Sequence, residues 1–128
     1  MAANESKRIM IVTDYRDVSE MIRRVSHDLG FRDTFAVTDT EKALVKLGEQ
    51  SQYGLVIADW NVGSSGGLSL LQQMRADEKL KSVQFIMMSA NANKPDIIAA
   101  KTAGANDFIV KPFSMGTLKR KLVAILGT

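Results

Sequence analysis

Five short apolar segments alternate along the chain with segments whose apolar residues recur every three or four positions. The short segments are Ile9–Val12, Phe35–Val37, Leu55–Ala58, Phe85–Met88 and Phe108–Val110. Several of them are continuously apolar, which is typical of strands buried on both faces of a parallel sheet. The alternation predicts an α/β fold in which right-handed crossovers place helices on both faces of a doubly wound, five-stranded sheet.

The intervening segments carry the periodicity and the end signals of helices. Their apolar residues lie within 18–29, 43–47, 68–74, 97–100 and 118–126. Gly30 and Gly104 are placed to end the first and fourth of these helices. Pro95 fits the first turn of the fourth helix. Ser114 and Gly127 are the expected N-cap and end of the fifth helix.

The length of the chain suits one domain. Five strand–helix units of roughly 25 residues each account for 128 residues, and no repeat, linker or low-complexity tract interrupts them. We therefore expect residues 1–128 to form a single domain.

Composition excludes several classes of site. The chain has no cysteine, so disulfides and thiolate-based sites are excluded, and its one histidine, His27, cannot build a multi-histidine metal centre. No apolar run reaches the roughly 18 residues of a membrane span. Because Met1–Arg8 lacks the apolar core of a secretion signal, we expect a cytoplasmic protein.

The basic residues concentrate near the C-terminus. The net charge is only +3, but Asp107 is the one acid after Ile97, against five basic residues, Lys101, Lys111, Lys119, Arg120 and Lys121. Such a stretch either binds an acidic partner or is an ordinary solvated helix surface, and both interpretations remain open.

Polar residues follow four of the five expected strands. Thr13 and Asp14 follow the first, Asp59 the third, Ser89 the fourth and Lys111 the fifth. In an open parallel sheet, ligands bind outside the carboxyl ends of the strands. We therefore expect two carboxylates, a hydroxyl and an ammonium to meet in one crevice.

This set of groups suits phosphoryl chemistry. Two neighbouring carboxylates stay ionised more readily with a cation between them, and Mg²⁺ prefers one or two carboxylates with water and phosphate oxygens. A carboxylate can also attack phosphorus and form an aspartyl phosphate. Lysine and a hydroxyl then hold the phosphoryl oxygens.

At these residues the sequence resembles the receiver domains of two-component response regulators, most closely the stand-alone CheY-type chemotaxis regulators. The likeness covers nearly the whole chain. It rests on five segments in the family's order and spacing, Ile11–Asp14, Val56–Asn61, Met88–Ala90, Ala103–Ala105 and Val110–Phe113. The resemblance implies the flavodoxin-like strand order 2-1-3-4-5.

The resemblance also implies a role for each site residue. Asp59 would be the phosphoacceptor, and Asp14, Asp59 and the backbone carbonyl of Asn61 would bind Mg²⁺. Ser89 would be the switch hydroxyl, Lys111 would bind the phosphoryl group, and Phe108 would turn inward, although a plain core role for Phe108 is equally open. Asn61 and Asn91 occupy positions where the family tunes phosphate lifetime. The Lys111–Pro112 peptide bond would be cis.

Two features depart from the family pattern. The family usually has two adjacent acids after the first strand, whereas Thr13 stands first here. We expect this loss of negative charge to weaken Mg²⁺ binding. After Asp59, Gly63–Gly67 holds three glycines and no proline. This segment is interpreted either as a mobile loop or as the turn into the third helix.

Four other functions share some of these sequence features. The main alternative is a degenerate receiver that binds proteins independently of phosphorylation. A flavodoxin-like nucleotide site is disfavoured because the loop 14–17 has two acids and no glycine. A haloacid-dehalogenase-like phosphatase would have a second aspartate where Asn61 stands. Nucleic-acid binding has only the basic C-terminal helix in its favour.

We therefore expect a signalling protein that catalyses only its own phosphorylation and dephosphorylation. Its partners would be a sensor histidine kinase or phosphotransfer protein and a protein target. By resemblance, the target would bind the surface formed by Ile97–Ala103, Asp107–Val110 and Leu118–Leu126. The basic residues on that surface predict an acidic target and salt-sensitive association.

Overall fold

The computed structural model describes residues 8–31, 33–49, 53–91 and 93–126. The predictions about the N-terminal seven residues and about Gly127 lie outside this part of the chain. The strands are β1 (Arg8–Val12), β2 (Asp33–Val37), β3 (Tyr53–Asp59), β4 (Gln84–Ser89) and β5 (Asp107–Val110). The helices are α2 (Arg16–Asp28), α3 (Thr40–Glu49), α4 (Gly66–Arg75), α5 (Lys94–Ala103) and α6 (Met115–Leu126).

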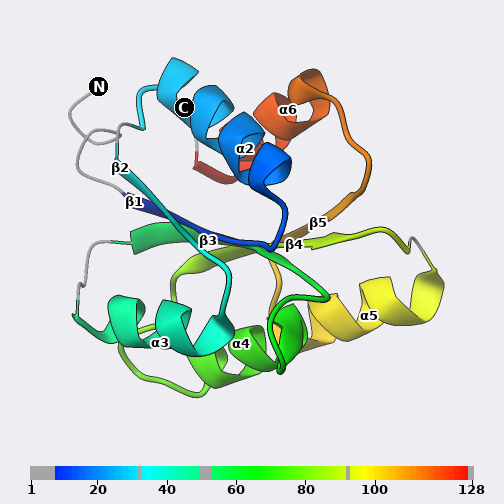
Figure 1. Ribbon diagram of the computed structural model, residues 1–128. Helices are drawn as coiled ribbons and strands as arrows, with labels where there is room; N and C mark the ends of the chain where they lie inside the picture. Colours follow the sequence, from blue (N-terminus) through cyan, green and yellow to red (C-terminus); the bar gives the residue numbers. More distant parts are fainter. Residues whose placement is uncertain (1–7, 32, 50–52, 92, 127–128) are drawn as a thin grey trace.

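The five strands form one parallel sheet in the order β2-β1-β3-β4-β5, so the predicted fold and strand order are confirmed. In Figure 1 α2 and α6 cover one face of the sheet, and α3, α4 and α5 cover the other. No helix in the described ranges is both long enough and apolar enough to cross a membrane.

The strand residues divide between two hydrophobic cores according to the face they occupy. Ile9 and Ile11 of β1 belong to the core beneath α2 and α6. Met10 and Val12, which alternate with them, belong to the core beneath α3 and α4. Because both faces are covered, successive residues of a strand are apolar, and this explains the continuous apolar runs of the sequence.

The predicted helix ends are formed by the expected residues. Gly30 and Gly104 follow α2 and α5 with φ angles of 97° and 108°, a region that favours glycine. The Asn93 side chain caps α5 by accepting a hydrogen bond from the Asp96 amide. The Ser114 hydroxyl likewise accepts from the backbone amide of Thr117 at the start of α6.

Candidate functional site

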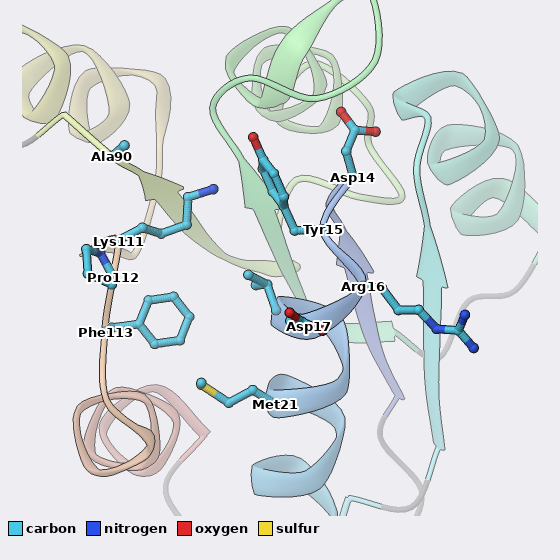
Figure 2. A pocket seen from close by; sticks show the side chains of 10 residues that line it. Asp14, Tyr15, Arg16, Asp17, Met21, Ala90, Lys111, Pro112 and Phe113 are labelled. Atoms are coloured by element: carbon cyan, nitrogen blue, oxygen red, sulfur yellow. The ribbon is translucent and has the colours of Figure 1, made fainter.

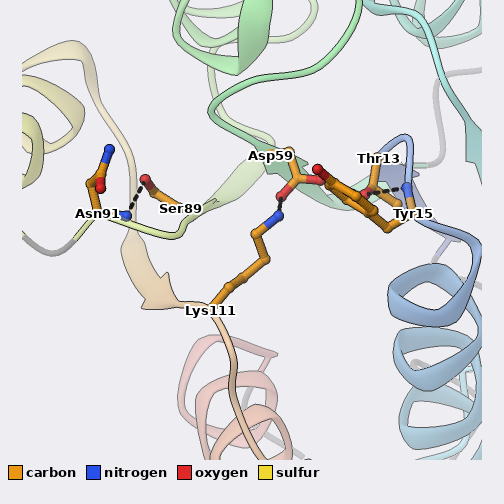
Figure 3. A network of polar contacts seen from close by, with 6 residues as sticks. All are labelled: Thr13, Tyr15, Asp59, Ser89, Asn91 and Lys111. Carbon is orange, nitrogen blue, oxygen red and sulfur yellow. Dashed lines mark hydrogen bonds and ion pairs between the residues drawn. The ribbon is translucent and has the colours of Figure 1, made fainter.

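Three of the polar residues predicted at strand ends meet around the end of β3. Asp59 is the last residue of this central strand, and only 1% of it is exposed. Thr13 directly follows β1, which pairs with β3, and Lys111 directly follows β5. Figure 3 shows the side chains of Thr13 and Lys111 approaching the Asp59 carboxylate from different sides.

The Thr13 hydroxyl donates a hydrogen bond to Asp59 Oδ2 inside the protein. Thr13 is itself buried, and its backbone amide continues the pairing of β1 with β2 by donating to the Val37 carbonyl at 3.1 Å. The Thr13 hydroxyl oxygen also accepts a hydrogen bond from the Tyr15 amide at 3.1 Å. Thr13 stands where the resemblance led us to expect an acid. Its hydroxyl is instead a hydrogen-bond donor that holds one oxygen of Asp59.

The other oxygen, Asp59 Oδ1, lies 2.7 Å from the Lys111 ammonium nitrogen. Within the described residues this buried oxygen has no partner in hydrogen-bonding geometry, so the ammonium acts on it mainly as a charge. The Lys111 side chain is 19% exposed. A buried carboxylate needs such a partner because an unpaired charge in the interior is strongly destabilising.

Ser89 lies at the end of the neighbouring strand, β4, and is buried. Its hydroxyl oxygen accepts a hydrogen bond from the Asn91 amide at 3.1 Å, and its carbonyl accepts from the Lys111 amide at 2.8 Å. In the described part of the chain, Ser89 makes no polar contact with Asp59 (Figure 3). The expected hydroxyl is therefore at the site's edge and bound to its own loop.

The remaining predicted site residues surround this centre. Asp14 and Asn61 are exposed in the loops after β1 and β3. Phe108 is buried in the core beneath α3, α4 and α5, which is compatible both with a plain core role and with a role in switching. Pro112 is exposed, and the peptide bond that precedes it is cis, as the resemblance implied.

Tyr15 is a residue of this site that the sequence analysis missed. Its ring centroid is 4.6 Å from the Lys111 ammonium nitrogen, in the range of a cation–π interaction. Tyr15 is 58% exposed, so no hydrophobic pattern marks it. The only available signal was an aromatic residue placed directly after the Thr13–Asp14 pair.

A cavity of about 600 Å³ opens beside the lysine. Figure 2 shows its walls, with Tyr15 and Met21 on one side and Lys111, Pro112 and Phe113 on the other. On the α2 side the cavity is lined by two charged residues, Arg16 and Asp17, and by two apolar ones, Val18 and Met21. Lys111 is therefore accessible from the space between the β1–α2 and β5–α6 loops, whereas Asp59 does not line this cavity.

The glycine-rich segment after Asp59 packs against the backbone of the site. Gly66 has a φ angle of 80°. A Cβ atom at Gly67 would lie 2.3 Å from the Asp59 carbonyl oxygen, which no side chain tolerates. The Gly67 amide also donates to the Trp60 carbonyl at 3.0 Å. These contacts favour the interpretation of Gly66 and Gly67 as the turn into α4, while the mobility of the loop stays a prediction.

The donors at this edge of the sheet fit a hard cation such as Mg²⁺. One oxygen of the buried Asp59 carboxylate has no hydrogen bond among the residues that the structure describes, and Asp14 and Asn61 place further oxygen atoms on the adjoining loops. The described residues contain no group of three or more histidine, cysteine or acidic side chains able to hold a metal ion. A cation here would therefore depend on two carboxylates, a backbone oxygen and water.

The basic surface near the C-terminus carries less free charge than its sequence suggests. Lys121 lies 2.9 Å from Asp107 and forms an ion pair with it. Lys101, Lys119 and Arg120 are exposed. The charge of this surface therefore rests on these three residues.

Comparison with known proteins agrees with the geometry. Residues 9–123 match the family described as the response regulator receiver domain. The chain is 39% identical over 119 residues to the chemotaxis protein CheY-3 of Vibrio cholerae serotype O1, covering 93% of this chain and 91% of that protein. It is 36% identical over 118 residues to the chemotaxis protein CheY of Pseudomonas aeruginosa, covering 92% and 94%.

One similar solved structure contains a magnesium ion. The receiver domain of the sensor histidine kinase PA1611 from Pseudomonas aeruginosa was determined with a magnesium ion coordinated in its active site cleft. This chain matches it with a TM-score of 0.82 and 28% identity, over 96% of this chain and 99% of that one. The resemblance inferred from the sequence is confirmed.

Proposed function

Because this chain belongs to the response regulator receiver family, we propose that it is a phosphoacceptor of a two-component system. Asp59 takes a phosphoryl group from the phosphohistidine of a sensor kinase or phosphotransfer protein, with Mg²⁺, in the cytoplasm. The phosphorylated form then changes its affinity for a protein target. The observation that carries this proposal is the buried Asp59 Oδ1, which lies 2.7 Å from the Lys111 ammonium and has no hydrogen bond within the described part of the chain.

The two oxygens of Asp59 have different roles in this proposal: Oδ2 is held in place and Oδ1 attacks phosphorus. Thr13 holds Oδ2, so the carboxylate keeps one orientation and Oδ1 has a lone pair for attack on phosphorus. As the new O–P bond forms, the P–N bond of the phosphohistidine breaks and the histidine leaves as imidazole. Phosphoryl transfer needs little covalent chemistry from the protein, so positioning and charge balance are its main contributions.

Lys111 supplies a fixed positive charge next to the attacking oxygen. The ammonium is already in place before the phosphoryl group arrives and then balances the charge of its oxygens. Asp14, Asp59 and the Asn61 carbonyl would hold Mg²⁺, which supplies further charge neutralisation on the phosphoryl oxygens. We propose that this binding is weak, because Thr13 contributes no negative charge.

Switching requires a group that contacts the phosphoryl group in only one state. We propose that the Ser89 hydroxyl is this group, exchanging its hydrogen bond with the Asn91 amide for one to a phosphoryl oxygen. Phe108, a buried residue of β5, would adjust its packing when the Ser89 hydroxyl moves. Asn61 and Asn91 would set how readily water reaches the acyl phosphate.

The proposed target surface comprises α5, β5 and α6. It carries the exposed cations Lys101, Lys119 and Arg120 beside exposed apolar side chains, among them Ile98 and Val110. Apolar contact area with basic residues around it suits a partner whose binding segment is acidic and amphipathic.

Phosphodonor labelling tests the proposal. The wild type, Asp59→Ala and the control variant Asp28→Ala are incubated with acetyl phosphate and Mg²⁺ and analysed by intact mass spectrometry. We expect about 80 Da, one phosphoryl group, on the wild type and on Asp28→Ala, whose exposed carboxylate lies on α2, and none on Asp59→Ala. Equal labelling of all three chains, or labelling of none, would instead favour a phosphorylation-independent interaction module.

A further inference from the structure

Tyr15 contacts both residues that hold Asp59. Its ring lies 4.6 Å from the Lys111 ammonium nitrogen, which in turn lies 2.7 Å from Asp59 Oδ1. Its backbone amide donates at 3.1 Å to the hydroxyl oxygen of Thr13, and Thr13 donates to Asp59 Oδ2. Figure 3 shows Tyr15 and Thr13 to one side of Asp59 and Ser89 to the other.

The amide contact orients the Thr13 hydroxyl and anchors the backbone of Tyr15. Because the Thr13 oxygen accepts the Tyr15 amide, its single hydrogen is directed to Asp59. The same hydrogen bond anchors the first residues of the β1–α2 loop, since Thr13 is buried and its amide bonds to Val37. The backbone of Tyr15 is thereby anchored at a place from which the ring reaches the lysine, without being part of a hydrophobic core.

Lys111 needs such a contact more than most lysines do. Its side chain has a flexible four-carbon stem with considerable rotamer freedom, and the same side chain that pairs with Asp59 also lines the cavity described above. An aromatic face within about 6 Å attracts an ammonium without removing its hydrogen-bond donors. The ring therefore restricts where the ammonium lies and leaves it able to bind phosphoryl oxygens.

We propose that Tyr15 is a positioning residue for phosphoryl acceptance, acting through Lys111. This inference rests on the function proposed above. The Tyr15 ring keeps the ammonium beside Oδ1 before the phosphoryl donor arrives, so the charge required in the transition state is already placed. Its contribution is to the rate of phosphorylation, and its effect on folding is small because Tyr15 is more than half exposed.

The ring is tested with Tyr15→Leu, which removes the aromatic face and keeps the backbone amide. Tyr15→Phe is the matched control because it retains the face and loses only the hydroxyl. Initial rates of labelling by acetyl phosphate are measured on the full chain at one fixed Mg²⁺ concentration. We expect the labelling rate of Tyr15→Leu to be about two- to fivefold lower than that of the wild type, the size of a partly exposed cation–π contact. The labelling rate of Tyr15→Phe should equal that of the wild type.

Two further measurements separate positioning from a structural role. In a Lys111→Met background, Tyr15→Leu should cause no additional loss, because the group on which the ring acts is gone. In proton NMR spectra, the Lys111 ε-methylene signals should be shifted upfield by the ring in the wild type and in Tyr15→Phe, and return to ordinary positions in Tyr15→Leu. Thermal unfolding of each variant checks that the fold is intact.

The outcomes distinguish this inference from the proposed function. An unchanged rate in Tyr15→Leu, an equal loss in the Lys111→Met background, or no upfield shift in the wild type would overturn the role of Tyr15 while labelling of Asp59 stands. If the wild type takes up no phosphoryl group although the upfield shift is present, the proposed function fails, and the role of Tyr15 fails with it.

Discussion

Replacing Thr13 with valine tests how Asp59 is held. Valine has nearly the shape of threonine, so the variant removes the hydroxyl that donates to Asp59 Oδ2 and leaves the packing almost unchanged. A hydrogen bond to a charged group contributes about 1.5–3 kcal/mol, and its loss leaves a buried carboxylate oxygen without a donor. The added methyl group returns up to about 0.8 kcal/mol of apolar burial.

The balance of these contributions is a loss of about 2 kcal/mol in the free energy of unfolding. For a chain of this length we expect the melting temperature to fall by about 6–10 °C. Urea and thermal unfolding followed by circular dichroism measure both quantities. Thr13→Ser is the matched control, because it keeps the hydroxyl and loses only a methyl group.

A double-mutant cycle with Asp59→Asn assigns the loss to this hydrogen bond. An amide oxygen at position 59 is neutral, so Thr13→Val should cost about 1 kcal/mol less in that background. If Thr13→Val unfolds like the wild type, or if Thr13→Ser is equally destabilised, then the hydroxyl does not hold the carboxylate and the account of Oδ1 as the free oxygen is wrong.

Three other substitutions test separate parts of the description. Thr13→Asp restores an acid next to the cation site and should raise Mg²⁺ affinity about tenfold or more in calorimetric titration, from the attraction between one added negative charge and a dication; unchanged affinity would reject the charge explanation. Gly67→Ala should lower the free energy of unfolding by more than about 2 kcal/mol, because its Cβ would meet backbone atoms. The control Gly48→Ala, whose Cβ would meet no atom within 4 Å, should be neutral or stabilising by up to about 1 kcal/mol. Charge reversal at Lys119 and Arg120 should slow association with an acidic target and weaken its salt dependence in stopped-flow measurements, and identical kinetics would remove these residues from the interface.

The order of the elements and the location of the site could be predicted because both follow from regular patterns. Buried parallel strands have continuous apolar sequences, and their ends lie at one edge of the sheet. Asp59, Ser89 and Lys111 each follow or end such a run, so their approach to one another was expected. The contact between Asp59 and Lys111 is the part of this expectation that the geometry bears out most directly.

The contacts of individual side chains could not be predicted in the same way. Thr13 was interpreted only as the loss of a negative charge, because the register that places its hydroxyl on Asp59 depends on the pairing of β1 with β3. Tyr15 is exposed and lies outside any periodic pattern. Lys121 was counted with the basic surface, but its partner Asp107 lies on another element and is reached only after folding.

The backbone hydrogen bond from Lys111 to the Ser89 carbonyl has a mechanical consequence. It ties the turn that follows β5 to the last residue of β4, so the serine cannot travel without pulling the main chain that carries the lysine. A displacement of the Ser89 main chain would therefore also move the backbone of Lys111, at the start of the segment that leads into α6. If Ser89 moves on phosphorylation, as we propose, lengthening the turn between Lys111 and Ser114 should reduce how far this movement changes the position of α6.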